Sequence, residues 1–117
     1  MKYLCLIYDD PKQLTGMTKT QGEAIMGEYF AFTEGIKKTG HYLGGNALQG
    51  VQTATSVRVR DGKLSTTDGP FAETKEQLGG YYLIEAKDLD DAIKVAGKIP
   101  SARLGTIEVR PIMEFNA

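Results

Sequence analysis

The order of strand-like and helical segments predicts an α+β fold, and three observations carry that prediction. Two amphipathic helical segments are separated by several strand-like segments, so helices and strands do not simply alternate. An Asp-Gly pair at positions 61–62 joins two alternating segments as an antiparallel hairpin. The N-terminal segment is apolar on both faces, which is typical of a central strand. We therefore expect an antiparallel-rich sheet with two helices on one face.

The composition is that of an ordinary folded domain. The chain has 117 residues, of which 41% are hydrophobic and 25% charged, so we expect a single domain over residues 1–117. The net charge of −1 argues against an electrostatic nucleic-acid binder. The lone Cys5 excludes an intrachain disulfide, and no Cys/His spacing resembles a zinc site. We predict neither a metal nor a cofactor.

The apolar N-terminal segment predicts a β-strand over residues 2–8. It stops at Asp9, Asp10 and Pro11, a turn-like sequence that we interpret as the end of the strand. The segment is too short for a signal sequence or a membrane span. We therefore expect a cytoplasmic protein with no membrane partner.

A long helix is predicted over about residues 20–39. Thr20 and Glu23 have the spacing of a capping box, and Gly40 suits the left-handed position that ends a helix. Apolar side chains recur at helical spacing and predict a core-facing stripe: Ile25, Tyr29, Phe32 and Ile36, widened by Met26 and Phe30.

The remaining elements follow from alternation and turn residues. Tyr42-Leu43 is a short strand candidate and Gly44-Gly45-Asn46 a turn. The hairpin comprises residues 56–60 and 63–66, and a polar loop follows over 67–77. We expect a strand over 78–86, a helix capped by Asp88 and running to about residue 98, and a last strand over 106–115. In that second helix the inward-facing side chains should be Leu89, Ala92, Ile93 and Ala96.

The sheet face opposite the helices also carries apolar residues. Such a face needs cover, and two copies packing these faces together would provide it. We therefore expect a symmetric homodimer.

The segment after the hairpin carries a family resemblance. Residues 67–82 read TDGPFAETKEQLGGYY, and this run resembles the signature of the DGPF group of YCII-related proteins. The resemblance extends to VRVRDG at 57–62, DDA at 90–92, IP at 99–100 and EVRP at 108–111, and thus covers about residues 54–113. It implies a ferredoxin-like α+β fold that forms a dimeric α+β barrel.

The same resemblance implies a cleft in which a His and an Asp lie together, and it implies an association with extracytoplasmic-function sigma factors. The family's His lies near the start of the long helix, where this chain has none. His41 lies beyond the other end of that helix, where we expect it to interact with the helix dipole rather than to bind metal or haem. Asp68 is therefore the one residue carried over.

Asp68 has two interpretations. As a general acid or base it would need a pKa shifted toward its working pH by burial or a like charge. As a structural residue it would accept backbone N–H bonds in the turn before Gly69-Pro70. Glu73 and Lys75 either form a solvated face or lie over a pocket mouth beside Asp68. We expect Phe71 to anchor this loop in the core.

Three further features are candidates for ligand or partner contacts. Arg58 is either an exposed cross-strand charge or a bidentate anion ligand in a cleft. Tyr82 is either a core residue or a ligand contact, and Gly79-Gly80 indicates a bulge or a close approach by a ligand or a partner subunit.

Two functions are consistent with these residues. In the first, the protein is a small enzyme that uses Asp68 as acid or base on an unknown small molecule, in a cleft near the dimer interface. In the second, it is a non-catalytic ligand-binding or regulatory module that works with a sigma factor. A third, haem or oxygen chemistry, rests on analogy with other dimeric α+β barrels alone.

Overall fold

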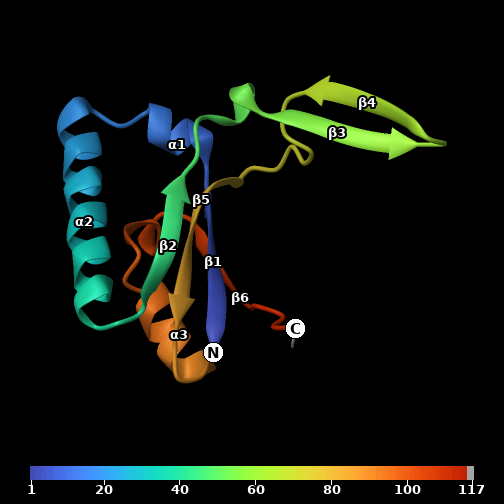
Figure 1. The fold of residues 1–117 in the computed structure, drawn as a ribbon. Helices are drawn as coiled ribbons and strands as arrows, with labels where there is room; N and C mark the ends of the chain where they lie inside the picture. The colour runs from blue at the N-terminus through green and yellow to red at the C-terminus, as the bar shows by residue number, and fades with distance from the viewer. Residues whose placement is uncertain (116–117) are drawn as a thin grey trace.

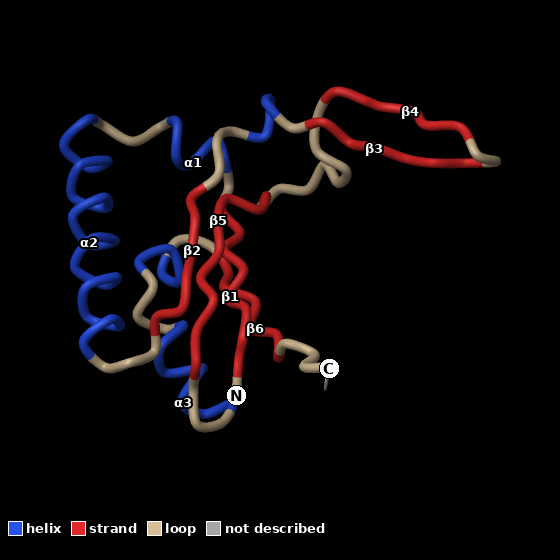
Figure 2. Tube along the Cα trace, viewed as in Figure 1, coloured by secondary structure: helices blue, strands red, loops and turns tan. Residues whose placement is uncertain are grey.

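A computed structural model of the chain describes residues 1–115 and has an antiparallel four-stranded sheet at its centre (Figures 1 and 2). The strand order is β2-β5-β1-β6, so the N-terminal strand is central, as predicted. The strands are β1 (Lys2–Asp9), β2 (Tyr42–Ala47), β5 (Gln77–Glu85) and β6 (Thr106–Pro111). The prediction of an α+β fold with a ferredoxin-like arrangement is confirmed.

Two helices pack on the same face of this sheet, which also confirms the prediction. Helix α2 (Lys19–Lys38) and helix α3 (Leu89–Ala96) bury their apolar side chains against the odd-numbered side chains of β1. Three short helical turns complete the fold: α1 (Pro11–Thr15), η1 (Val51–Thr53) and η2 (Pro100–Arg103). None of the helices within residues 1–115 is long and apolar enough to cross a membrane.

Helix α2 begins slightly earlier than predicted. The Oγ1 atom of Thr18 accepts the N–H of Gln21 at 3.1 Å, and Oε1 of Gln21 accepts the N–H of Thr18 at 2.9 Å. This is a complete capping box, so the predicted pair Thr20 and Glu23 was wrong. Gly40 ends the helix with a φ of 79°, as predicted.

The core-facing stripes are narrower than the sequence indicated. Phe32 and Ile36 are buried, but Met26 and Phe30 are 56% and 67% exposed. In α3, Ala92 and Ala96 are buried, whereas Leu89 and Ile93 are about half exposed. A helix on a flat sheet presents a limited arc to it, and the flanking apolar positions then face outward.

Strand β2 runs through the predicted turn at 44–46. A Cβ atom on Gly45 would lie 2.8 Å from the carbonyl oxygen of Tyr81 and 2.9 Å from the ring of Tyr82. The glycine therefore permits a close approach to β5, and the sequence alone could not distinguish this role from a turn. The last strand also differs, because β6 ends at Pro111 on the edge of the sheet.

The predicted hairpin forms but does not join the main sheet. Strands β3 (Thr55–Arg60) and β4 (Lys63–Asp68) pair around Asp61 and Gly62, whose φ values are 52° and 72°. The hairpin projects away from the four-stranded sheet (Figure 1). The radius of gyration is 16.2 Å, whereas a compact domain of this length has about 13 Å.

A β-bulge interrupts the pairing of β5 with β1, which is one of the two alternatives that the Gly79-Gly80 pair indicated. Ile7 pairs with Gly80 but the next residue, Tyr8, pairs with Leu78, so Gly79 is the extra residue. The bulge lies beside Asp9 at the end of β1, because a Cβ on Gly79 would come 3.5 Å from Oδ2 of Asp9.

Candidate functional site

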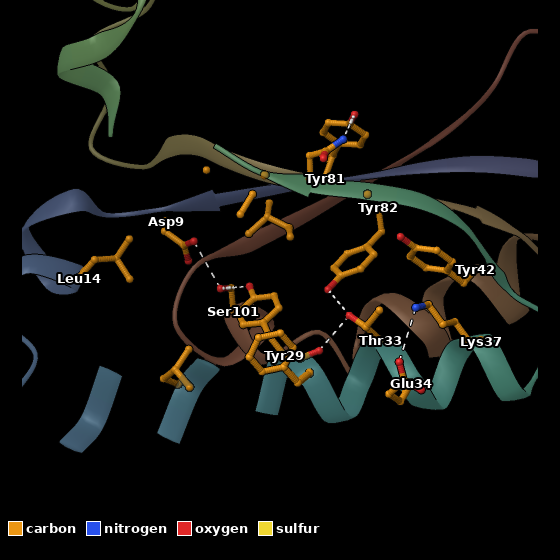
Figure 3. Close-up of a pocket in the computed structure, with 18 residues that line it drawn as sticks. Asp9, Leu14, Tyr29, Thr33, Glu34, Lys37, Tyr42, Tyr81, Tyr82 and Ser101 are labelled. Atoms are coloured by element: carbon orange, nitrogen blue, oxygen red, sulfur yellow. Dashed lines mark hydrogen bonds and ion pairs between the residues drawn. The ribbon is translucent and has the colours of Figure 1, made fainter. Parts of the chain in front are cut away.

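A cavity of about 560 Å³ lies between helix α2 and the sheet (Figure 3). Apolar side chains form much of its wall, among them Ile7, Leu14, Ile25 and Phe30. The polar side chains that matter below come from four elements, namely β1, α2, β5 and η2: Asp9, Tyr29, Thr33, Tyr82 and Ser101. The cavity is of the size that holds a small organic ligand.

Asp9 is the acid of this cavity. It ends β1 at an odd-numbered position, so it shares the buried face of Tyr3, Cys5 and Ile7 and is only 8% exposed. Its Oδ2 atom accepts a hydrogen bond from Oγ of Ser101 at 3.3 Å, whereas its Oδ1 atom has no hydrogen-bond partner within residues 1–115. Burial raises the pKa of Asp9, against the lowering effect of the Ser101 hydrogen bond, and Glu76 raises it further.

Ser101 connects Asp9 to a tyrosine. It is buried because it is the second residue of η2, directly after Ile99 and Pro100, which are both fully buried. Its Oγ atom lies 2.5 Å from the hydroxyl of Tyr29, on the core-facing side of α2. Burial raises the pKa of Tyr29, so its hydroxyl remains protonated at neutral pH.

A second pair of hydroxyl groups lies one turn further along α2, where Thr33 meets Tyr82. Oγ1 of Thr33 donates to the carbonyl oxygen of Tyr29 at 2.9 Å and lies 2.8 Å from the hydroxyl of Tyr82. The Tyr82 ring packs edge-on against Phe32 and Tyr42, with centroid distances of 5.1 and 6.4 Å. These contacts hold the aromatic rings in place on the side of the cavity that lies away from the Asp9 carboxyl.

Charged side chains line the cavity near Tyr42. The Lys37 ammonium lies 5.2 Å from the centre of the Tyr42 ring and 3.5 Å from Oε1 of Glu34. Figure 3 shows this pair on α2, well separated from Asp9. The cavity therefore has the Asp9 carboxyl at one end and the Lys37–Glu34 ion pair at the other.

The arrangement can move a proton between Asp9 and a bound molecule. A buried carboxyl with a raised pKa is poised to exchange a proton with a bound molecule. Within the part of the chain that the structure describes, no three His, Cys, Asp or Glu side chains gather closely enough to bind a metal ion.

Comparison with known proteins gives the family. The sequence profile of the YCII-related domain matches residues 1–116, nearly the whole chain. The chain belongs to the YCII-related family. An uncharacterized protein of Rhizobium meliloti is 34% identical to this YCII-related protein over 114 residues, which are 96% of this chain and 92% of that protein.

A solved structure shares the fold of this YCII-related protein. It is a 5-chloro-2-hydroxyhydroquinone dehydrochlorinase from Burkholderia phenoliruptrix, in complex with 2,5-dihydroxybenzoquinone. The two chains superpose with a TM-score of 0.59, covering 98% of this chain and 96% of the other, at 16% sequence identity.

The residues predicted from the sequence lie in two separate places. Tyr82 lines the cavity. Asp68 is exposed at the end of β4, and Glu73 and Lys75 are exposed in the loop that follows; none of the three lines the cavity. The structure therefore does not bring Asp68 together with Tyr82.

The loop after the hairpin is not anchored as expected. Phe71 is 79% exposed, so its predicted place in the core was wrong. Instead, the guanidinium of Arg58 on β3 lies 5.6 Å from the centre of the Phe71 ring. This contact connects β3 to the loop that follows β4.

His41 follows the end of α2 and contacts α3. Its Nδ1 atom lies 2.7 Å from Oγ1 of Thr39, and its Nε2 atom lies 3.1 Å from Oδ2 of Asp91. Asp91 also accepts the backbone N–H of Lys87, and this bond, with the His41 contact, lowers the pKa of Asp91. His41 therefore links α2 to α3 outside the cavity.

Sequence reasoning missed Asp9 and Ser101. The sequence predicts Asp9 as the end of the first strand, but the alternation of Tyr3, Cys5 and Ile7 extends to it and places it on the core face. Ser101 carries no comparable signal, because its burial depends on how η2 packs against the sheet.

Proposed function

We propose that this YCII-related protein is a small enzyme that transfers a proton on a hydroxylated ring compound bound in the cavity, with Asp9 as the acid–base group. The observation that carries the proposal is the buried Asp9 carboxyl, whose Oδ1 atom has no partner within the described chain. A buried carboxylate oxygen without a partner is costly, so Asp9 is suited to take up a proton that a bound ligand releases.

The lining of the cavity suggests the class of substrate. The rings of Tyr29, Tyr42 and Tyr82 favour a flat, unsaturated ligand. A hydroxyl group would meet the end of the cavity where Tyr29, Ser101 and Asp9 lie, and a second polar oxygen would meet the Lys37–Glu34 pair at the other end. The ligand of the structural neighbour, 2,5-dihydroxybenzoquinone, has both features and is a suitable first compound to test.

Asp68 is the rival acid–base group. Its support is the resemblance of the loop sequence, whereas Asp9 is supported by burial and by its place in the cavity. A screen of hydroxyquinols, catechols and hydroxyquinones for binding and turnover would first identify a substrate. Variants of the two residues would then distinguish Asp9 from Asp68 as the acid–base group. We expect Asp9→Asn to abolish the turnover found and Asp68→Asn to retain it, and the reverse result would favour Asp68.

A binding or regulatory module is the alternative function. It would be favoured if ring compounds bind in the cavity and none is converted. A sigma-factor partner is tested separately by a pull-down with a sigma factor encoded beside the protein, and recovery of nothing would argue against that partner.

We further propose that two copies of the chain pack through the sheet face opposite the helices. Leu4, Leu6 and Tyr8 point to that face from the central strand and remain only half-buried. From β5, Tyr81 also points away from the cavity (Figure 3). A second copy would cover this face and keep the cavity face of each sheet for its own helices.

A further inference from the structure

Three polar side chains at one end of the cavity form a directed chain of hydrogen bonds. Oγ of Ser101 donates its one proton to Oδ2 of Asp9 at 3.3 Å. The lone pairs of the Ser101 Oγ atom are therefore free to accept a hydrogen bond. The Tyr29 hydroxyl lies 2.5 Å from the same Oγ atom and is the donor that completes the chain. When Asp9 is ionised, every O–H along the chain therefore points toward its carboxylate.

We infer that Tyr29 is the group that meets the substrate hydroxyl and that Ser101 relays its proton to Asp9. The inference rests on the proposed function, since it assigns roles within the same cavity. Ser101 is then a positioning residue, and Tyr29 a catalytic residue.

The relay conserves protons and charge. The substrate hydroxyl gives its proton to the phenolic oxygen of Tyr29, whose own proton moves to Oγ of Ser101. The Ser101 proton moves to Oδ2 of Asp9. One O–H bond breaks and one forms at each of the two hydroxyl groups. The net result is a substrate oxyanion and a neutral Asp9 carboxyl, with no oxidant or further reactant needed.

The surroundings of these hydrogen bonds favour proton transfer toward Asp9. Glu76, which precedes β5, is the charged neighbour that raises the pKa of Asp9, and its Oε1 atom is held by Oγ1 of Thr106 at 2.8 Å. Burial acts in the same sense on Asp9. Taking up a proton therefore relieves a buried negative charge at the end of the relay.

The first test needs no substrate. In the free full-length protein, the ¹³C resonances of the Asp9 carboxyl and of the Tyr29 ring carbon bearing the hydroxyl are followed by NMR as pH is raised. We expect the Tyr29 resonance to shift with the same midpoint as Asp9. Ser101→Ala should remove this shift, and Ser101→Thr, which retains a hydroxyl, should restore it.

A matched variant controls for changes in the cavity. Tyr82→Phe removes a hydroxyl that bonds Thr33 and not Ser101, so the response of Tyr29 should persist. If Ser101→Ala does not fold, Ser101→Cys serves in its place, and its weakly donating thiol should reduce the shift. Absence of the Tyr29 shift in the unmodified protein, or its persistence in Ser101→Ala at full size, would overturn the relay.

Activity gives the second test once a substrate is known. Ser101→Ala should lower kcat by roughly 100-fold, the lower range for acid–base groups, with KM little changed and with Ser101→Thr restoring the rate. Failure to find any substrate would count against the proposed function while leaving the titration result standing. An unchanged kcat in both Ser101→Ala and Tyr29→Phe would count against the relay alone.

Discussion

Gly105 lies directly against the backbone of Tyr8. A Cβ atom placed on Gly105 would come 2.1 Å from the carbonyl oxygen of Tyr8 and 3.1 Å from Oδ1 of Asp9. The connection between η2 and β6 thus passes the end of β1 at a separation that no other residue type allows. This close passage also brings Ser101, four residues earlier, within reach of Asp9.

Gly105→Ala should destabilise the fold. The added methyl group would clash with backbone that is paired on both sides, and we expect a loss of about 1–3 kcal/mol in the free energy of unfolding. Urea unfolding of the purified variant measures it. Gly27→Ala is the control, because a Cβ at that position of α2 meets nothing within 4 Å and should stabilise the helix by up to about 1 kcal/mol. Equal stability of the two variants would contradict the packing described.

Asp9→Asn should change how stability depends on pH. The raised pKa means that the folded state keeps the Asp9 proton where the unfolded chain has lost it, so ionisation costs stability as pH rises above about 4. The difference in unfolding free energy between Asp9→Asn and the unmodified protein should therefore grow with pH, reaching about 1–3 kcal/mol. Denaturant unfolding at several pH values measures it, with Asp68→Asn as the exposed control. If this difference in unfolding free energy stays constant across pH, the raised pKa of Asp9 is refuted.

Cys5 should be unreactive in the folded protein. Its side chain is fully buried in the central strand, and burial raises the pKa of the thiol to about 11. At pH 8 a disulfide reagent should therefore modify it only as fast as the protein unfolds. Ser65→Cys adds an exposed thiol on β4 that should react at once. Rapid modification of Cys5 without denaturant would show that β1 is more open than the structure indicates.

Leu6→Glu should convert the proposed dimer to a monomer. The substitution places a charge in the middle of the half-buried sheet face, where a second copy would have to desolvate it. Sedimentation equilibrium measures the mass of each form. Ile93→Glu, at a half-exposed position of α3, should leave the mass unchanged. A monomeric unmodified protein would exclude the dimer.

The sequence indicated the fold better than the site because the two depend on different kinds of information. Alternation and the Asp61-Gly62 turn are local signals, and they located β1, β5 and the hairpin closely. Ser101 meets Asp9 across 92 positions of sequence, through packing that no local pattern encodes. Gly45 and Gly79 were ambiguous for the same reason, since a glycine marks a special position without saying whether it is a turn, a bulge or a close contact.

The length of the projecting hairpin can vary without affecting the rest of the fold. Because β3 and β4 run outward from the four-stranded sheet, the core does not determine how far they extend (Figures 1 and 2). Adding two residues to each strand would move the Asp61-Gly62 turn outward by roughly 7 Å and would preserve which face each side chain occupies. The reach of this arm can therefore change through small insertions while the cavity and its carboxyl stay as they are.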